Sequence, residues 1–577
     1  MASLEAHIQG IVHALEQGWV AKSIRAMAFL GAIVGVSLLY ILMEFKGLST
    51  REGMEQAQIA RELARGNGFS TKSIRPLAMW QLSSHSRQTP EVSFPDTYHA
   101  PLPPFFHALG MKLIEKHWKM SSREILYMGD RVVAVTSIAF FFLALGMTYL
   151  IGARLFDRPL ALLVCGMLLL CDLFWQFALS GLPQTMMLFF FMLALYFLVR
   201  ALQNVEAEKG TGFWICACGV AFGLLALCHG ATVWLFAGAT LFATLALRPR
   251  LITFVLLVGF FGVTVSPWLI RNYSVSGSPG GVAVYAHLGE LRQSEEAWMR
   301  TYEPDFTGIN PRLLRQKVQE GVTEQIGGVY QHMGWCIAAP IFFVALLHPF
   351  RTRQTTHLRW GVFIMWGLGV IGVVLLGSSE KAIAANNLQI LFVPVMALYG
   401  MAMLVILWNR QPFDHKFLRY SFFTLLYLAC SVPMVMALSR WGRGGKIQWP
   451  PYVPPFIAIL ADWVEPREVI VSDVPWAVGW YADRRSLWVP MRLTDFVRIN
   501  DYKEAGGPLA GLYLTPQSGD RKFLSEIGKG EYKEWAGFIL RQPNTKDFPL
   551  KTGTALPIDN ECIFFSDRDR WSGGGAQ

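Results

Sequence analysis

Long apolar runs alternate with short polar connections along most of this chain. The runs extend over roughly 16–20 residues, which is enough for a helix to cross a hydrocarbon core of about 30 Å. They lack the period of two that is typical of barrel strands, so helices are the expected membrane spans. The pattern predicts a polytopic α-helical membrane protein with about 11 transmembrane helices. The predicted spans are residues 26–43, 132–151, 160–179, 186–199, 213–228, 231–247, 251–270, 335–347, 360–376, 388–407 and 420–438.

Basic residues in the short connections predict the orientation of these spans. Lys22 and Arg25 precede the first span, and the connections on the same side carry most of the other short-loop Lys and Arg residues. Because basic residues mark the cytoplasmic side, the N-terminus is expected in the cytoplasm. The resulting parts are a cytoplasmic amphipathic helix (1–25), a transmembrane domain (26–438) with extracytoplasmic loops 44–131 and 271–334, and an extracytoplasmic domain (439–577).

Composition agrees with a membrane protein, since 53% of the 577 residues are hydrophobic and only 16% are charged. A soluble chain of this length carries more surface charge. The net charge of +10 is partly the cytoplasmic signal, yet the extracytoplasmic loops also hold cations such as Arg61, Arg65 and Arg271. Cations in these loops suit a phosphate-bearing ligand or anionic lipid head groups. Nucleic acid is excluded as a partner because these loops face away from the cytoplasm.

The last part of the chain has the composition of an ordinary soluble domain. A Pro-rich segment at 450–455 precedes a helical pattern at 456–464, and short apolar runs then read as buried strands. Alternation of helix and strand predicts a small α/β domain. The predicted strands are residues 469–473, 487–489, 510–514 and 562–565.

A polar stretch, residues 47–104, follows the first predicted span. Glu52 begins a run of helix-forming residues there, so a carboxylate is expected at the boundary between membrane and water. Ionisable groups at such boundaries tend to be functional. Glu52 is therefore the leading candidate for a catalytic base. Glu55, on another face of the same helix, is the fallback, and Asp96 is either a turn residue or a second acid.

Four local motifs carry a resemblance to a known family. Residues 52–61 stand where that family has Asp-Glu-x-x-x-Ala-x-x-x-Arg after its first span, and a Gly-Asn-Gly-Phe turn follows at 66–69. Residues 101–105 are similar to its Lys-Pro-Pro-Leu motif, and 266–273 to its Pro-Trp-x-x-Arg-Asn-Tyr motif. Over residues 26–407 the chain thus resembles the GT-C superfamily of membrane glycosyltransferases, in its dolichyl-phosphate-mannose–protein mannosyltransferase-like and aminoarabinose-transferase-like bacterial branch.

The resemblance implies inverting transfer of a sugar from a polyprenyl-phosphate donor to a protein, lipid or glycan acceptor, on the outer face of a bacterial inner membrane. Chemically, such a transfer needs one base, here Glu52, and positive charge for the departing phosphate. The expected phosphate-binding residues are Arg61, His99, His229, Arg271 and Lys381.

The chain also departs from the family pattern. Glu52 replaces the leading Asp, and Gly53 replaces the Glu that follows it. Asn387 and Leu388 stand where an Arg-Tyr pair is common, which removes an expected cation. A catalytically inactive scaffold is therefore one alternative function. A transporter or flippase of a lipid-linked molecule is another, although paired repeats and charges within the spans are not evident.

No residue pattern predicts a metal site. The outer loops contain no Asp-x-Asp motif, which disfavours a metal-dependent nucleotide-sugar donor. No cofactor is predicted with certainty, and a divalent metal is left open.

Overall fold

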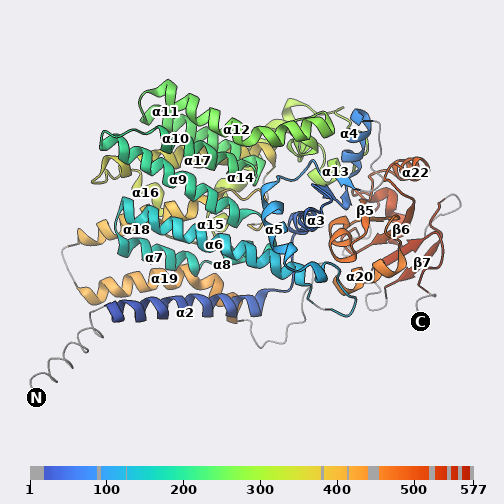
Figure 1. Cartoon of the computed structure of the whole chain (residues 1–577), viewed down its shortest axis with the longest axis horizontal. Helices are drawn as coiled ribbons and strands as arrows, with labels where there is room; N and C mark the ends of the chain where they lie inside the picture. The colour runs from blue at the N-terminus through green and yellow to red at the C-terminus, as the bar shows by residue number, and fades with distance from the viewer. Residues whose placement is uncertain are drawn as a thin grey trace, which may run out of the picture.

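The computed structural model of the chain describes residues 19–86, 93–124, 126–377, 382–411, 415–439, 454–518, 527–541, 548–556 and 562–571. A bundle of long helices fills one end of the molecule, and a mixed sheet with short helices fills the other (Figure 1). A layer of shorter helices lies between them (Figure 1).

Apolar helices form the bundle, as their composition predicts. Among the described residues, six helices are long and apolar enough to cross a membrane, or seven if a helix pair bent by 59° is counted as one span. Shorter apolar helices accompany them. The bundle elements are α2 (Trp19–Glu44), α6 (Met128–Leu155), α7 (Arg158–Leu169), α8 (Asp172–Ser180), α9 (Gln184–Glu206), α10 (Gly212–Ala226), α11 (Val233–Ala246), α12 (Arg250–Ser276), α16 (Ile341–Ala345), α17 (Arg353–Leu376), α18 (Val393–Asn409) and α19 (Lys416–Ser439).

The predicted count of eleven spans is not confirmed. The apolar run at 160–179 divides into α7 and α8 at the bend, where the chain leaves helical geometry before Asp172. The run at 335–347 contains only the five-residue helix α16, because Pro340 precedes it and Trp335 has a positive φ of 58°. Hydropathy counts apolar residues and does not register such breaks.

The two long loops, predicted to be extracytoplasmic, fold into the layer between bundle and sheet. The first loop contributes α3 (Arg51–Arg65), β1 (Ser70–Thr71), β2 (Ser73–Ile74), α4 (Pro76–Ser86), β3 (Phe94–Pro95), α5 (Leu102–Lys112) and η1 (Glu115–His117). The second contributes η3 (Gly281–Leu288), α13 (Glu295–Arg300), α14 (Pro311–Gly327) and α15 (Val329–His332). The turn η2 (Gly230–Thr232) and the turn η4 (Gln389–Phe392) precede α11 and α18.

The predicted α/β fold of the C-terminal part appears as a six-stranded sheet. We call the described residues from Pro454 to Trp571 the C-terminal unit. Its elements are α20 (Pro454–Trp463), β4 (Val469–Ser472), α21 (Pro475–Ala477), η5 (Val478–Ala482), β5 (Arg485–Trp488), α22 (Leu493–Tyr502), β6 (Leu509–Leu514), η6 (Lys533–Trp535), α24 (Ala536–Ile539), β7 (Thr552–Ala555) and β8 (Ile563–Ser566). The predicted strands correspond to β4, β5, β6 and β8.

The sheet is not built from the C-terminal unit alone. Its strand order is β2-β5-β4-β6-β8-β7, so β2 from the first loop forms one edge. The four strands β2, β5, β4 and β6 run parallel to one another, and β8 runs antiparallel to both of its neighbours, β6 and β7. The hydrophobic core beneath the sheet likewise includes Leu48, Met54 and Leu77 of the first loop. The first loop and the C-terminal unit therefore share one core.

Candidate functional site

A cavity of about 1200 Å³ lies where the bundle, the two loops and the C-terminal unit meet. It is larger than pockets for ordinary drug-sized ligands, which measure roughly 300–1,000 Å³. Loop elements and the C-terminal unit supply its polar wall: Thr50, Arg51, Glu52, Gln56, Tyr98, His99, His287, Glu290, Glu295, Glu296 and Gln517. Helix ends and turns of the bundle supply most of its apolar wall: Cys228, Ala231, Val233, Trp234, Leu376 and Ile383.

Glu52 reaches this cavity because α3 begins directly beside it. The Thr50 side chain caps the helix by accepting a hydrogen bond from the Gly53 amide at 3.3 Å, and its hydroxyl donates to the Ser180 carbonyl at 2.9 Å. These bonds fix the first turn of α3 against the end of α8. A carboxylate in the first turn also suits the positive end of the helix dipole. The Glu52 side chain is 24% exposed and faces the cavity.

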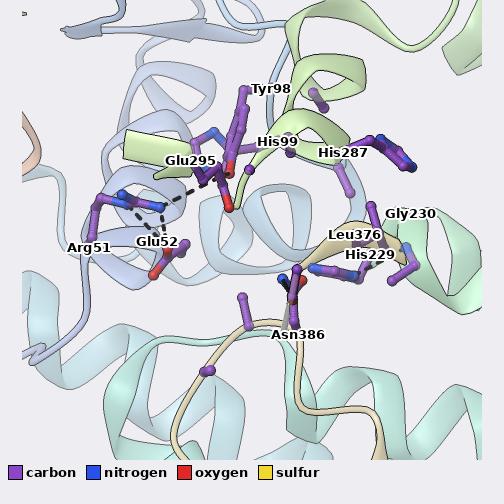
Figure 2. A pocket seen from close by; sticks show the side chains of 18 of the residues that line it. Arg51, Glu52, Tyr98, His99, His229, Gly230, His287, Glu295, Leu376 and Asn386 are labelled. Atoms are coloured by element: carbon purple, nitrogen blue, oxygen red, sulfur yellow. Dashed lines mark hydrogen bonds and ion pairs between the residues drawn. The ribbon is translucent and has the colours of Figure 1, made fainter. Parts of the chain in front are cut away.

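Arg51 is the closest charged partner of Glu52 (Figure 2). Its Nε and Nη2 both donate to Glu52 Oε1, at 3.1 and 2.8 Å. The same guanidinium donates to Glu296 at 3.0 Å and lies 3.9 Å from Glu295. The base candidate therefore belongs to a cluster of three carboxylates around one guanidinium.

The presence of glycine at position 53, where the family pattern has an acid, has a steric cause. A Cβ at this position would meet the Ser180 carbonyl oxygen at 2.4 Å and the Gly181 carbonyl carbon at 3.1 Å. α3 and the end of α8 thus approach too closely for a side chain. A second acid cannot occupy position 53 in this packing.

A buried ionic chain lies behind the cavity wall. Glu55 is fully buried and accepts from Arg75 at 2.6 Å, and its Oε2 lies 3.0 Å from His99 Nε2. On the other side of the ring, His99 Nδ1 lies 3.2 Å from Asp96 Oδ2. The predicted fallback base and the predicted second acid are therefore both committed to His99.

The pKa values follow from these contacts. Burial alone would raise the pKa of Glu55, but Arg75 and His99 outweigh it and lower that pKa to about 2. Burial works against the His99 cation, yet Asp96 and Glu55 raise its pKa to about 9. The Asp96 carboxyl is held well below its usual pKa range by His99, against its burial. At neutral pH all four groups of this ionic chain are charged, and the His99 cation lies between two carboxylates at the cavity wall.

His229 lines the opposite wall of the cavity (Figure 2). Its Nδ1 accepts a hydrogen bond from the Ala231 amide at 3.3 Å and so caps η2. Burial lowers the pKa of this imidazole to about 4. Because Nδ1 accepts, the proton of the neutral ring is on Nε2, which can donate to a ligand.

Arg61 and Arg271 are not among the residues that line the cavity. Arg271 donates to the carbonyl oxygens of Asp96 and Phe69, the latter at 3.0 Å, and so ties α12 to the first loop. Arg61 is fully buried and faces the C-terminal unit. Lys381, the remaining predicted cation, lies outside the described residues.

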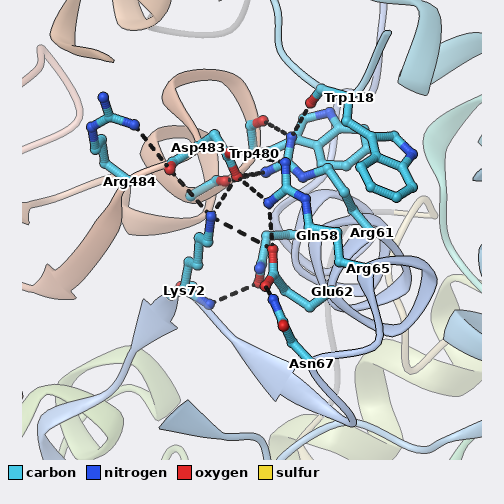
Figure 3. A network of polar contacts seen from close by, with 12 residues as sticks. Gln58, Arg61, Glu62, Arg65, Asn67, Lys72, Trp118, Trp480, Asp483 and Arg484 are labelled. Atoms are coloured by element: carbon cyan, nitrogen blue, oxygen red, sulfur yellow. Dashed lines mark hydrogen bonds and ion pairs between the residues drawn. The ribbon is translucent and has the colours of Figure 1, made fainter. Parts of the chain in front are cut away.

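Arg61 belongs to a second polar network, which joins α3 to η5 (Figure 3). It donates to the carbonyls of Gly479 and Trp480 at 2.6 and 2.7 Å and pairs with Asp483 at 3.0 Å. Asp483 also pairs with Arg65 at 2.8 Å and with Lys72 at 2.6 Å. The family-like arginine of α3 thus holds the first loop to the C-terminal unit.

Several cavity residues escaped the sequence analysis. Tyr98 donates to Glu295 at 2.5 Å, and its ring stacks on Arg75 at 4.0 Å. Glu295 and Glu296 begin α13 after Ser294, whose side chain accepts from the Ala297 amide. That capping pattern is readable from sequence, but it predicts a helix start and not a place beside Arg51.

Within the described ranges, no group of three or more His, Cys, Asp or Glu side chains is arranged to hold a metal ion. The arrangement instead offers a cluster of three carboxylates around one guanidinium, and one buried imidazolium, beside an apolar wall.

No protein-family model and no curated protein sequence matches the chain. Its fold does match solved structures. ArnT from Cupriavidus metallidurans bound to undecaprenyl phosphate matches with a TM-score of 0.53 at 12% identity, over 94% of this chain and 98% of that one. The same protein in the apo state gives a TM-score of 0.54 at 12% identity, with the same coverage of 94% and 98%.

A third match is the archaeal oligosaccharyltransferase AglB from Archaeoglobus fulgidus, in complex with an inhibitory peptide and a dolichol-phosphate. Its TM-score is 0.52 at 11% identity, over 88% of this chain and 72% of that one. Identities this low establish similarity of fold. The predicted polytopic α-helical fold is shared with these structures, and together with the apolar helices this supports an integral membrane protein.

Proposed function

We propose that this protein is an integral-membrane glycosyltransferase that moves a sugar from a polyprenyl-phosphate donor to an acceptor, with inversion, and that Glu52 is the general base. The reaction takes place on the extracytoplasmic side of a bacterial inner membrane, and the acceptor is a protein, a lipid or a glycan. The observation that carries the proposal is the position of Glu52, a partly exposed carboxylate in a cavity with one polar and one apolar wall.

The structural neighbours support the donor class. One is bound to undecaprenyl phosphate and another to dolichol-phosphate, and both share the overall fold of this chain. The apolar wall formed by Val233, Trp234 and Leu376 suits the lipid part of such a donor, and the polar wall suits its sugar.

In the proposed reaction, Glu52 accepts the proton of an acceptor hydroxyl. The acceptor oxygen then attacks the anomeric carbon from the side opposite the phosphate, and the bond between that carbon and the phosphate oxygen breaks. The lipid phosphate leaves with the bonding electrons. The His99 cation and the Nε2–H of neutral His229 stabilise this negative charge across the cavity. One base suffices because phosphate is a good leaving group.

Replacement of the base tests the proposal. Purified protein is assayed with a panel of radiolabelled polyprenyl-phosphate sugars and acceptors. Glu52→Gln keeps the shape but cannot take a proton, so kcat is expected to fall by about 10²–10⁴-fold while donor binding persists.

Glu115→Gln, at an exposed glutamate outside the cavity, is the matched control and is expected to retain full activity. Equal transfer by wild type and Glu52→Gln removes Glu52 from the mechanism. Movement of the lipid across vesicles without any sugar transfer favours a flippase instead.

A further inference from the structure

The guanidinium of Arg51 contacts two carboxylates and two indole rings. The carboxylates are those of Glu52 and Glu296, described above. The guanidinium carbon lies 5.9 Å from the ring centre of Trp476 and 5.3 Å from that of Trp488. Both distances are within the range of cation–π attraction. The Arg51 side chain is only 15% exposed, so these contacts are largely shielded from water.

The two indoles form a fixed platform. Trp488 ends β5 and Trp476 lies in α21, which follows β4. Carboxyl ends of neighbouring parallel strands meet at one edge of a sheet, which brings the two rings together. They pack edge to face at 5.4 Å, and both are buried. Arg51 thus rests on the rigid edge of the sheet.

A guanidinium held in this way fixes the carboxylate next to it. Both of its hydrogen bonds to Glu52 go to the same oxygen, Oε1, and neither goes to Oε2. A carboxylate anchored through one oxygen keeps the other for a proton from the acceptor. Without this anchor, a Glu side chain on the first turn of a helix samples several rotamers.

We infer that Arg51 is a positioning residue that orients Glu52 for proton abstraction, and that the C-terminal unit takes part in the reaction by holding Arg51 with Trp476 and Trp488. The inference rests on the proposed function of Glu52. It gives the C-terminal unit a role in assembling the base.

The groups around Arg51 show what removal of its guanidinium would change. Arg51 faces Glu52 on α3, Tyr98 before α5, and Glu295 and Glu296 on α13. Glu52 also faces His229. Removal of the guanidinium leaves three carboxylates close together without their shared partner, so Glu52 is expected to lose its fixed position.

The test combines four proteins: wild type, Arg51→Gln, Glu52→Gln and the double variant. In Arg51→Gln, kcat is expected to fall about 100-fold with little change in KM, since a misplaced base costs about this much. In the Glu52→Gln background the same substitution is expected to have no further effect, because Arg51 acts through Glu52. A fifth protein, Arg51→Lys, keeps the charge but not the forked geometry of the guanidinium, and it is expected to restore only part of kcat.

The sheet side is tested with Trp488→Leu and Trp488→Phe. Loss of the aromatic face in Trp488→Leu is expected to lower kcat by about 10-fold, whereas Trp488→Phe stays close to wild type. Thermal unfolding of each variant identifies any that fails to fold. If a Trp488 variant fails to fold, the comparison of Arg51→Gln with wild type tests the inference.

Three results overturn the inference. If Arg51→Gln raises KM and leaves kcat unchanged, Arg51 binds substrate and does not position the base. If Arg51→Gln and wild type behave alike while Glu52→Gln is inactive, the inference fails and the proposed function stands. If Glu52→Gln is fully active, the proposed base fails and the inference falls with it.

Discussion

At the scale of single residues, the change from an acidic pair to Glu52 and Gly53 is explained by packing. The sequence alone suggested that loss of the second acid weakens the site. The structure instead places Gly53 against the carbonyls of Ser180 and Gly181, so close contact of two backbones requires a glycine there. Glycine at position 53 is thus a condition for the first turn of α3 to reach the cavity.

Gly53→Ala tests this packing. The added Cβ would meet the Ser180 oxygen at 2.4 Å, so the protein is expected to lose about 1–3 kcal/mol of stability, as overpacked sites do. Thermal unfolding in detergent measures the loss. Gly146→Ala on α6, where a Cβ meets nothing within 4 Å, is the control and is expected to be neutral or slightly stabilising. Equal stability of both variants contradicts the steric explanation.

Residue-level chemistry was only partly readable from sequence. Glu52 could be selected because it follows the first span directly, which is a local signal. Arg51, its immediate neighbour, could not be given a role, because its other partners Glu296 and Trp488 lie far along the chain. His99 was expected near phosphate and does line the cavity, but both of its ring nitrogens face carboxylates.

At the scale of elements, α3 has two functional ends. Its first turn carries Glu52 into the cavity, and its last turns carry Arg61 and Arg65 to Asp483 of the C-terminal unit. The sequence suggested a phosphate-binding role for Arg61 because the arginine has a family-like spacing. Its actual partner lies in a distant segment that no local pattern connects to α3.

Asp483→Asn tests this junction. Asp483 has a φ of 55°, which Asn also tolerates, so the substitution removes charge without straining the backbone. Because Asp483 is 9% exposed and Arg61 is fully buried, the cost is expected to be about 3 kcal/mol at neutral pH. Thermal unfolding measures it. Asp305→Asn, at an exposed ion pair with Arg292, is the control and is expected to have little effect.

The same junction has a defined pH dependence. Burial opposes the charge on Asp483, but Arg61, Arg65 and Lys72 hold its pKa below the usual range. A carboxyl with a lowered pKa stabilises the folded state above its unfolded pKa of about 3.9 and loses this contribution as the pH falls further. The stability difference between wild type and Asp483→Asn is therefore expected to shrink below about pH 4. A difference that stays constant on acidification contradicts the assignment.

At the scale of the whole molecule, the two halves are joined by a shared sheet. The sequence predicted the apolar helices and four strands, because long runs and buried strands have clear patterns. It did not predict β2, since two residues are too few to show a period. It also counted eleven spans, because hydropathy does not distinguish a span from a broken run such as 335–347.

The shared sheet predicts that the C-terminal unit does not fold alone. A fragment of residues 454–577 lacks β2, which leaves β5 as an open edge, and lacks the core residues of the first loop. Such a fragment is expected to aggregate and to show no cooperative thermal transition. A fusion that adds residues 47–118 through a flexible linker is expected to restore the transition. Cooperative unfolding of the fragment alone, at the temperature of the full chain, contradicts this expectation.

The parallel pairing of β2 with β5 also constrains how the protein is made. Ile74 pairs with Leu487, about four hundred residues later in the chain. At a synthesis rate of about 5–20 residues per second, β5 is translated on the order of 20–80 s after β2. The sheet can form only after the whole helical bundle has been translated. Its formation also requires that the first loop and the C-terminal unit lie on the same side of the membrane.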